Sequence, residues 1–188
     1  VGSEMCIRDS SNGDLLMVVR NNYFWSEETK EIPFIANGDI MEVVRVNGVK
    51  ELYGFRFADT NIRLLDYKGQ ELSVKILLNT LQANGPSLSN KDYKLLYERV
   101  AEDYPFESSK AGLARRIKAD PFFNALQVKF AYAITCHKSQ GGQWKNVLID
   151  QGFFREEMIS REYIRWLYTA ITRATERVFL INFSDSFF

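Results

Sequence analysis

The amino-acid sequence predicts a mixed α/β fold built from three successive regions, and three observations support this. Short apolar runs separated by Gly, Asn and Asp occupy residues 13–84 and indicate a small β-barrel. Apolar residues recur at helical spacing in residues 85–127, which indicates a helical insertion. Residues 128–188 alternate between strand-like runs and an amphipathic helix, as α/β domains do. A leader at residues 1–12 has no structural period, and we exclude it from the fold.

The barrel prediction depends on strand and turn signals. Apolar runs lie at residues 15–19, 40–46 and 49–57. The last two are separated by Asn47-Gly48, and both residue types tolerate the positive φ of a tight type I′ turn. We therefore expect a hairpin that turns at this Asn-Gly pair.

Two helices are expected in the insertion. Ser89, with Asp92 three residues later, fits a capping box, and the helical spacing continues until Pro105. A second helix is expected over residues 110–119. It carries four basic residues, Lys110, Arg115, Arg116 and Lys118. Such a cluster is either a solvated face or a nucleic-acid contact, and the solvated face is the commoner case.

The last region combines three strands with one helix. Residues 128–135 and 147–149 read as buried strands, and residues 178–181 read as a third. The helix is expected over residues 161–174, with Ser160 as its N-cap. Ligands of open α/β sheets bind beyond the carboxyl ends of the strands, so we expect the site after residue 135.

One stripe of this helix should face the sheet. At 100° per residue the stripe contains Ile164, Leu167, Tyr168, Ile171 and Ala174. Arg173 then lies nearly opposite, pointing away from its own domain. An arginine in this position is either a solvated surface residue or a group that reaches across an interface.

Bulk composition excludes several classes of protein. The 188 residues include 24 basic and 24 acidic side chains, so no global positive charge indicates a nucleic-acid partner. The two cysteines, Cys6 and Cys136, are too few and too far apart for a disulfide framework, which favours a cytoplasmic location. No apolar run approaches the roughly 18 residues of a membrane span, so no membrane partner is expected.

The segment AITCHKSQGGQW, residues 133–144, concentrates chemically useful side chains. Its one histidine and one cysteine cannot supply the three or four ligands of a metal site. Cys136 and His137 would point to opposite faces of an extended strand, so a Cys-His nucleophile is disfavoured and Cys136 is expected in the core. Lys138-Ser139 lacks the preceding glycines of a Walker A loop, and no Walker A sequence occurs elsewhere in the chain. What remains is a loop that could contact phosphates held by another domain.

At this point two strings match a known family. TCHKSQGGQW and, farther along, LYTAITRATERV resemble motifs V and VI of superfamily 1 helicases, specifically the RecD-like branch. Upstream, GDLLMVVRNNY and NGDIMEVVRV resemble segments that open the SH3-like barrel inserted in the second motor domain of those enzymes. The resemblance covers residues 13–183 and implies a RecA-like P-loop-type sheet domain interrupted by that barrel.

The resemblance also implies site residues. Thr135, His137 and Lys138 are expected to contact single-stranded DNA along its backbone. Gln140 and Gly141 are expected to face the nucleotide. Gln143 is expected to contact the nucleotide as well. It stands where the family commonly has a ribose-binding Glu, and a neutral amide can still bond a hydroxyl.

Motif VI supplies the expected catalytic group. Arg173 is expected to be an arginine finger that contacts the γ-phosphate, with Tyr168 and Thr172 supporting it. The implied cofactors are ATP and Mg²⁺, both held mainly by an N-terminal RecA-like domain that would precede this chain. The chain is therefore expected to be the C-terminal motor part of a 5′ to 3′ ATP-dependent DNA helicase, inactive by itself. A non-catalytic binding module and a cysteine hydrolase are the alternatives.

Overall fold

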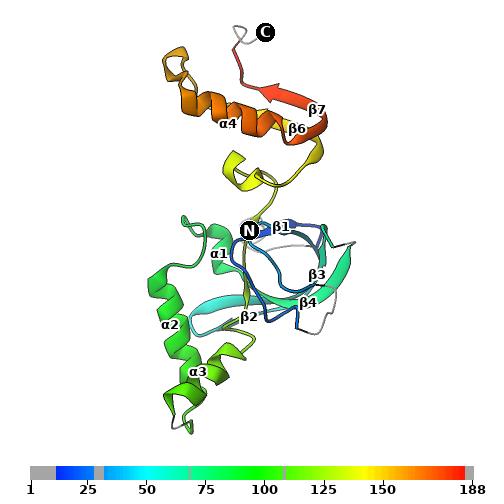
Figure 1. Ribbon diagram of the computed structural model, residues 1–188. Coiled ribbons are helices and arrows are strands. Elements are labelled where there is room, and N and C mark those ends of the chain that lie inside the picture. Colours follow the sequence, from blue (N-terminus) through cyan, green and yellow to red (C-terminus); the bar gives the residue numbers. More distant parts are fainter. Residues whose placement is uncertain (1–11, 28–31, 68, 108, 185–188) are drawn as a thin grey trace, which may run out of the picture. The chain divides into compact units, whose positions relative to one another are not determined.

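The computed structural model describes residues 12–27, 32–67, 69–107 and 109–184. The expected leader, including Cys6, therefore lies almost wholly outside the described residues. The chain divides between Tyr132 and Ala133 into two compact units, which we call unit 1 and unit 2 (Figure 1).

Unit 1 contains a closed five-stranded β-barrel, which confirms the predicted barrel. Its strands are β1 (Leu15–Val18), β2 (Ile40–Leu52), β3 (Phe55–Leu64), β4 (Gln70–Leu77) and β5 (Leu126–Phe130). Neighbouring strands are antiparallel except β4 and β5, which are parallel. Alternate side chains of these strands fill the barrel interior with Leu, Ile, Val and Met.

The strand expected at residues 128–135 belongs to the barrel, so its assignment to the C-terminal α/β part is wrong. The observed β5 ends at Phe130 and pairs with β1 through Val128. The apolar run at Val128 looks the same in either setting, because a strand buried by a barrel and one buried in a parallel sheet are both continuously apolar.

The hairpin between β2 and β3 turns at Tyr53-Gly54 rather than at Asn47-Gly48. Tyr53 and Gly54 have φ values of 59° and 80°, the positive pair that a type I′ turn needs. Asn47 instead lies at a register shift inside β2, where Val46 pairs with Thr60 and Gly48 with Asp59. The Asn-Gly pair thus forms a β-bulge, which also uses the conformational freedom of these residues.

Three helices lie between barrel strands β4 and β5 in the chain: α1 (Asn79–Gln82), α2 (Asn90–Ala101) and α3 (Lys110–Lys118). The predicted cap is confirmed, because the Ser89 hydroxyl accepts from the Asp92 N–H at 3.1 Å. Helix α2 ends at Ala101, short of the expected Pro105, and α3 begins after the N-cap Ser109. These helices bury Leu96, Val100 and Ile117 against barrel residues Phe55, Phe57 and Leu77.

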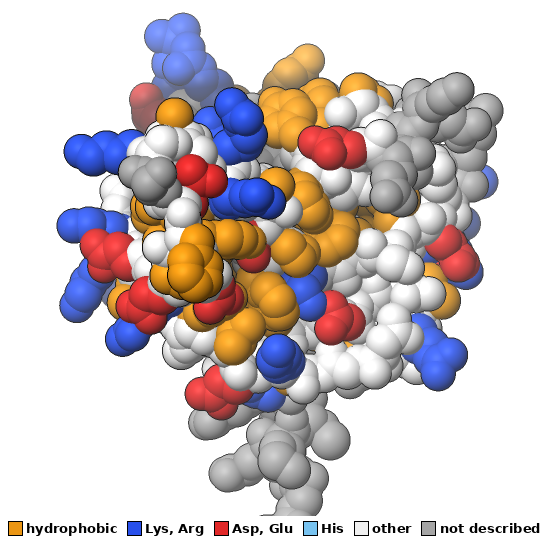
Figure 2. Space-filling model, turned by 90° about the horizontal axis from the view of Figure 1, so that it is seen from below, with side chains coloured by type: hydrophobic (Ala, Val, Ile, Leu, Met, Phe, Trp, Pro, Cys, Tyr) orange, Lys and Arg blue, Asp and Glu red, His pale blue; other side chains and the backbone are white. Residues whose placement is uncertain are grey.

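The face of the chain in Figure 2 shows hydrophobic side chains gathered near its centre, with acidic and basic side chains intermingled around them. The four basic residues of α3 are all exposed. Positive and negative side chains are mixed on this face, so it does not present a patch of one charge sign to a partner.

Unit 2 is a small βαβ arrangement. Its elements are two short 3₁₀ turns, η1 (Cys136–Ser139) and η2 (Glu156–Met158), strand β6 (Trp144–Asp150), helix α4 (Arg161–Ile171) and strand β7 (Ala174–Ile181). Strands β6 and β7 are parallel neighbours joined through α4, and Ser160 caps α4 as predicted. The further strands of a RecA-like sheet are not among the described residues.

The predicted packing face of α4 is wrong. Ile164, Tyr168 and Ile171 are exposed, with Tyr168 70% exposed, whereas Ala170 is buried. Two parallel strands present too little surface to cover a wide apolar helix. Parallel sheets are ordinarily covered on both faces, whereas here much of the apolar surface of α4 is exposed.

Candidate functional site

The loop at residues 135–143 folds into a tight turn rather than an extended strand. The carbonyl of Thr135 accepts the backbone N–H groups of Lys138 and Ser139 at 2.9 and 3.1 Å, which closes η1. The Ser139 hydroxyl donates to the Cys136 carbonyl at 2.7 Å and is buried. These bonds fix the backbone of η1, so the side chains that point outward from it are attached at fixed positions.

The side chains of this turn divide between core and solvent. Thr135, His137 and Lys138 are exposed, as contacts to an outside ligand would require. Cys136 is half-buried, and its thiol donates to the Trp166 carbonyl at 3.3 Å. Burial raises the pKa of this thiol despite the nearby Arg173 guanidinium, which works in the opposite direction. A thiol held protonated in this way is a poor nucleophile, which argues against the cysteine hydrolase.

Both glycines of the loop have a structural requirement. Gly141 has a φ of 88°, a conformation that side-chain-bearing residues rarely adopt. A Cβ on Gly142 would lie 2.3 Å from Cη2 of Trp144, so the indole ring packs directly against the glycine backbone. Gln140 and Gln143 flank these glycines and are exposed. The loop therefore displays two amide side chains beside a backbone that an outside group can approach closely.

Arg173 does not lie on the helix, contrary to the prediction. Helix α4 ends at Ile171, Thr172 is its C-cap, and Arg173 occupies the single position before β7. The half-buried guanidinium donates to the Thr169 carbonyl at 3.0 Å from Nε, to the Gly142 carbonyl at 3.3 Å from Nη1 and to the Thr172 hydroxyl at 3.2 Å from Nη2. These three bonds hold it against the Gly-Gly turn.

The two segments meet at the amino-terminal ends of the strands. Trp144 pairs with Ala174, the first residues of β6 and β7, and the Trp144 N–H donates to the Arg173 carbonyl at 2.9 Å. The expectation that the site lies beyond the carboxyl ends of the strands is therefore wrong for these residues. It assumed that residue 135 ends a strand of this sheet, whereas the preceding strand β5 belongs to the barrel.

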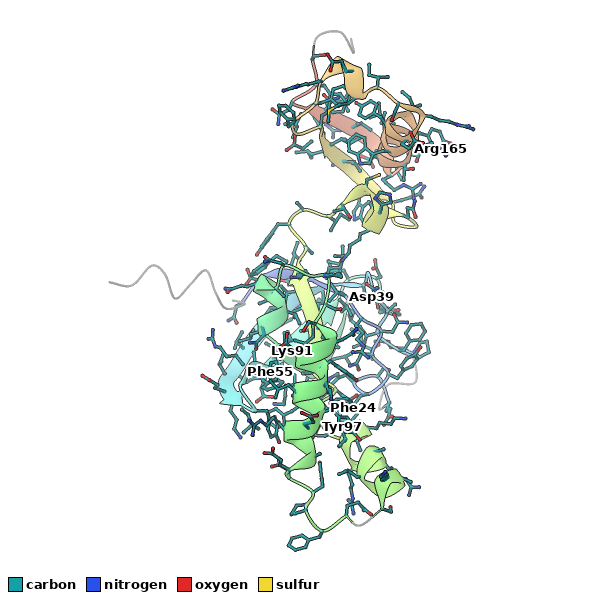
Figure 3. All side chains as sticks on the ribbon, turned by 90° about the vertical axis from the view of Figure 1, so that its left-hand side faces the viewer. Phe24, Asp39, Phe55, Lys91, Tyr97 and Arg165 are labelled. Atoms are coloured by element: carbon teal, nitrogen blue, oxygen red, sulfur yellow. The ribbon has the colours of Figure 1, made fainter. Side chains whose placement is uncertain are left out.

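A groove of about 450 Å³ runs between η1 and α4. His137 and Gln140 line it on one side, and Arg165, Trp166 and Thr169 line it on the other. Arg165 is exposed on α4 (Figure 3). The lining also includes the acidic Glu162 and does not include Arg173, so the groove combines one arginine and one carboxylate with hydrogen-bonding side chains.

Sequence reasoning brought the right segments together but missed residues that hold them, two of which act through backbone atoms. Thr169 and Trp144 were not singled out, and Thr172 was expected only to support Arg173 in general. The available signal was Thr169 four residues before Arg173, because a helix places the carbonyl at that spacing near a following side chain. Tyr168, expected to support the site, is exposed and only its carbonyl takes part, accepting from the Thr172 hydroxyl at 2.8 Å.

A metal-binding cluster and a membrane-spanning helix are both absent from the part of the chain that the structure describes. Among those residues, no cluster of three or more His, Cys, Asp or Glu side chains could hold a metal ion. Within the same residues, no helix is long and apolar enough to cross a membrane.

One family of known proteins matches part of this chain. Residues 130–181 match the UvrD-like helicase C-terminal domain, a segment that begins at the last residue of β5 and ends with β7. The match thus contains η1, α4 and Arg173, and it supports a superfamily 1 helicase C-terminal region in this part of the chain.

Two curated relatives extend the comparison. The chain is 39% identical over 64 residues to the uncharacterized protein MJ1519 of Methanocaldococcus jannaschii, a match that covers 34% of this chain and 5% of the relative. It is 23% identical over 194 residues to the uncharacterized protein R530 of Acanthamoeba polyphaga mimivirus, which covers 84% of this chain and 39% of the relative. The chain therefore spans well under half the length of either relative.

Proposed function

We propose that this chain is the C-terminal motor part of a cytoplasmic, RecD-like, ATP-dependent DNA helicase that moves 5′ to 3′ on single-stranded DNA. The observation that carries the proposal is the bond between the Arg173 guanidinium and the Gly142 carbonyl, at 3.3 Å. It joins the two segments that resemble motifs V and VI. The family match over residues 130–181 supports the helicase class independently.

The nucleotide side of the site consists of Arg173 with Gln140, Gly141 and Gln143. An arginine has five N–H donors, and the three bonds described above leave one on each terminal nitrogen. A γ-phosphate on a neighbouring domain could accept these, and the positive charge would stabilise the transferring phosphoryl group. Gln140 and Gln143 would bond the remaining polar groups of the nucleotide through their amides.

The DNA side of the site consists of Thr135, the N-cap of η1, with His137 and Lys138 on η1, and all three are exposed. Hydroxyl, imidazole and ammonium groups donate to phosphate oxygens, and such contacts position a strand without reading its sequence. Apart from Arg173, the proposed nucleotide and DNA contacts therefore lie on one short loop, residues 135–143. ATP binding would close a cleft onto Arg173 and shift η1 along the strand, and hydrolysis would release it.

ATP and Mg²⁺ would be held mainly by an N-terminal RecA-like domain carried by a longer polypeptide. Within these 188 residues there is no Walker A sequence. ATP would supply the phosphoryl group and Mg²⁺ would neutralise charge on its oxygens. The residues present here fit the role of the second wall of such a cleft.

The test is steady-state ATP hydrolysis, with and without oligo-dT, by a longer polypeptide that joins this chain to a Walker A-bearing domain. Arg173→Ala should lower kcat about 10³-fold or more, since arginine fingers contribute that much. Arg177→Ala is the matched control, because Arg177 is an exposed arginine on β7 four residues away, and it should leave kcat unchanged. The isolated chain should not hydrolyse ATP. Unchanged kcat in Arg173→Ala, or hydrolysis by the pure chain, would overturn the proposal.

A further inference from the structure

Unit 1 contains Asn-Gly pairs, in which an asparagine can react with its own backbone. They are Asn12-Gly13, Asn37-Gly38, Asn47-Gly48 and Asn84-Gly85. In this reaction the glycine nitrogen attacks Cγ of the asparagine, the bond from Cγ to the side-chain nitrogen breaks, and ammonia leaves with the proton of the glycine amide. Water then opens the succinimide ring to aspartate or isoaspartate. Glycine favours the attack because it has no side chain to hinder the approach.

The attack has two structural requirements. The glycine N–H must be free of hydrogen bonds, because a bonded nitrogen has to be released before it can react. The asparagine must also be able to turn its Cγ toward that nitrogen. A side-chain amide that is held by a hydrogen bond, or a backbone held inside a strand, cannot make this turn without breaking contacts.

Three of the four pairs fail one of these requirements. The N–H groups of Gly13 and Gly38 donate to carbonyls of β2 and β1, at 2.7 and 2.8 Å. Asn47 lies within β2, and its Nδ2 donates to Oδ1 of Asn61 at 2.8 Å. Reaction at these pairs requires local opening of the barrel, so it should be slow in the folded chain.

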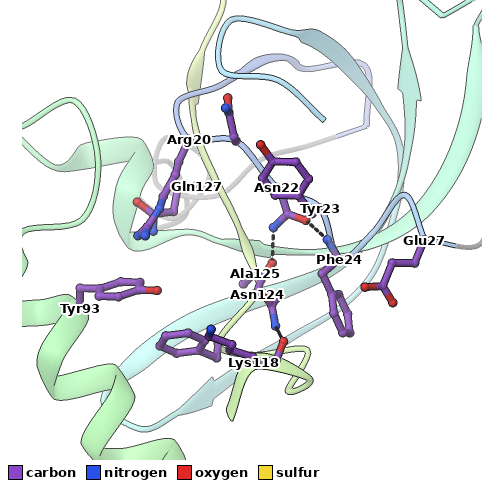
Figure 4. Close-up of a pocket in the computed structure, with 12 residues that line it drawn as sticks. Arg20, Asn22, Tyr23, Phe24, Glu27, Tyr93, Lys118, Asn124, Ala125 and Gln127 are labelled. Atoms are coloured by element: carbon purple, nitrogen blue, oxygen red, sulfur yellow. Dashed lines mark hydrogen bonds between the residues drawn. The ribbon is translucent and has the colours of Figure 1, made fainter. Parts of the chain in front are cut away.

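Asn84-Gly85 meets both requirements. The pair is exposed in the segment between α1 and α2. Among the residues that the structure describes, none accepts a hydrogen bond from the Gly85 N–H or bonds the side-chain amide of Asn84. In contrast, the amides of Asn22 and Asn124 donate to the carbonyls of Asn124 and Lys118, both at 2.8 Å (Figure 4).

The segment is anchored to β5 on both sides of this pair. Before it, the Ala83 carbonyl accepts from the Lys129 ammonium. After it, the Leu88 N–H donates to Oε1 of the buried Gln127 at 2.9 Å. A covalent change at Asn84 lies between these anchors and breaks neither, so we expect the barrel and the start of α2 to keep their structure.

We propose that Asn84 is a site of spontaneous deamidation in the folded protein, through a succinimide formed with Gly85. Water is the co-reactant, and the product is a mixture of isoaspartate and aspartate. The formal net charge at pH 7 falls from 0 to −1, because the 24 acidic side chains gain one while the 24 basic ones are unchanged. The site uses no residue of the helicase motifs, so it is independent of the proposed motor function.

The test is incubation of the 188-residue chain in mildly alkaline buffer, followed by peptide mapping with mass spectrometry. Asn84 should deamidate roughly tenfold or more faster than the other three asparagines, a factor equivalent to about 1.4 kcal/mol for releasing a bonded glycine N–H. In concentrated urea, which removes the fold, the four pairs should react at similar rates. Isoaspartate should form at position 84, because direct hydrolysis of the side chain gives aspartate alone.

Gly85→Ala tests the attack by the backbone nitrogen. Its Cβ would lie 3.4 Å from the Ser87 carbonyl oxygen, an ordinary contact, so the variant should fold. The added methyl group hinders the attack, and deamidation at Asn84 should slow several-fold. Gly48→Ala is the matched control and should leave the rate at Asn84 unchanged.

Ion exchange separates the deamidated chain from the unmodified one by its added negative charge. Urea unfolding of the two forms should give similar free energies of unfolding, and a large loss in the deamidated form would contradict the role of the two anchors. Equal rates at the four pairs in the folded chain, an unmodified Asn84 while the urea sample reacts, or no effect of Gly85→Ala would each overturn the proposal.

Discussion

The guanidinium of Arg173 lies 3.3 Å from the carbonyl oxygen of Gly142, although 31 residues separate them in the chain. The same guanidinium is fixed at its Nε by the Thr169 carbonyl. Three bonds to two segments restrict the rotamers of a long side chain that would otherwise lose much entropy on binding. Arg173 is therefore preorganised, and the residues that hold it become testable independently of Arg173.

Thr172→Val should impair hydrolysis through the position of Arg173. The Thr172 hydroxyl accepts from Nη2 of Arg173 at 3.2 Å, and valine has the same shape without that acceptor. In the longer polypeptide we expect kcat to fall about tenfold, a loss equivalent to about 1.4 kcal/mol of transition-state stabilisation. The KM for ATP should change less than kcat, because the nucleotide is held mainly by the other domain. Steady-state kinetics over a range of ATP concentrations measures both constants.

Thr175→Val is the matched control for that variant. Thr175 lies two residues beyond Arg173, and its hydroxyl donates to the Trp144 carbonyl at 3.4 Å without touching the guanidinium. It should leave kcat near the wild-type value. Equal losses in both variants would show that general damage to this junction, rather than the position of Arg173, explains the effect.

Gly142→Ala should destabilise the loop that carries the candidate site. Its new Cβ would lie 2.3 Å from the Trp144 ring, so the half-buried indole must move. Overpacking of this kind costs about 1–3 kcal/mol. Hydrogen exchange measured by mass spectrometry should show faster exchange in the peptide that contains residues 142–150.

Trp144→Leu provides the control for the Gly142 prediction. A smaller side chain at 144 leaves room for the new Cβ, so Gly142→Ala should cost less in that background. A double-mutant cycle measures this coupling. If the two substitutions are simply additive, contact with the indole is not the reason that position 142 requires glycine.

Local signals in the sequence predicted where helices and strands form better than they predicted which elements pair or pack together. Ser89 and Ser160 cap helices as expected, because a cap depends only on residues within one turn. The placement of Val128 failed, because an apolar strand does not reveal which sheet buries it. The resemblance to helicase motifs V and VI predicted that the two segments of the candidate site meet. The packing of Trp144 on Gly142 could not be predicted, because it depends on tertiary contacts that no spacing rule encodes.

A pair of glycine substitutions tests the corrected hairpin. Gly54 has a φ of 80° and open space around it, so Gly54→Ala should lower the free energy of unfolding of unit 1 by about 1–2 kcal/mol through backbone strain alone. Gly48 is exposed and has no positive φ, and a Cβ added to it would meet no atom within 4 Å. Gly48→Ala should therefore be neutral or stabilising by up to about 1 kcal/mol. Urea unfolding followed by circular dichroism measures both, and the reverse order of effects would place the turn at Asn47-Gly48 after all.

Cys136 should make the stability of unit 2 fall at alkaline pH. Burial raises the pKa of its thiol in the folded chain, against weaker opposing effects of Arg173 and the Ser139 hydroxyl. A raised folded pKa means that the contribution to stability is complete below the unfolded pKa of about 8.5 and is lost as pH rises through the folded pKa. The wild type should therefore lose more stability than Cys136→Ala as the pH rises above about 8.5. Tyrosines with raised pKa values, such as Tyr53, affect both proteins equally and cancel in the difference.

Alkylation of the Cys136 thiol provides a second measurement of the same property. Iodoacetamide reacts with the thiolate, so modification at pH 7.5 should be much slower in the folded chain than in urea, with the modified peptide identified by mass spectrometry. The hydrogen bond from the thiol to the Trp166 carbonyl, at 3.3 Å, further favours the protonated form. Equal rates in the folded and unfolded chains would contradict the raised pKa. They would also return the cysteine hydrolase to consideration, because a nucleophilic cysteine must form its thiolate in the folded protein.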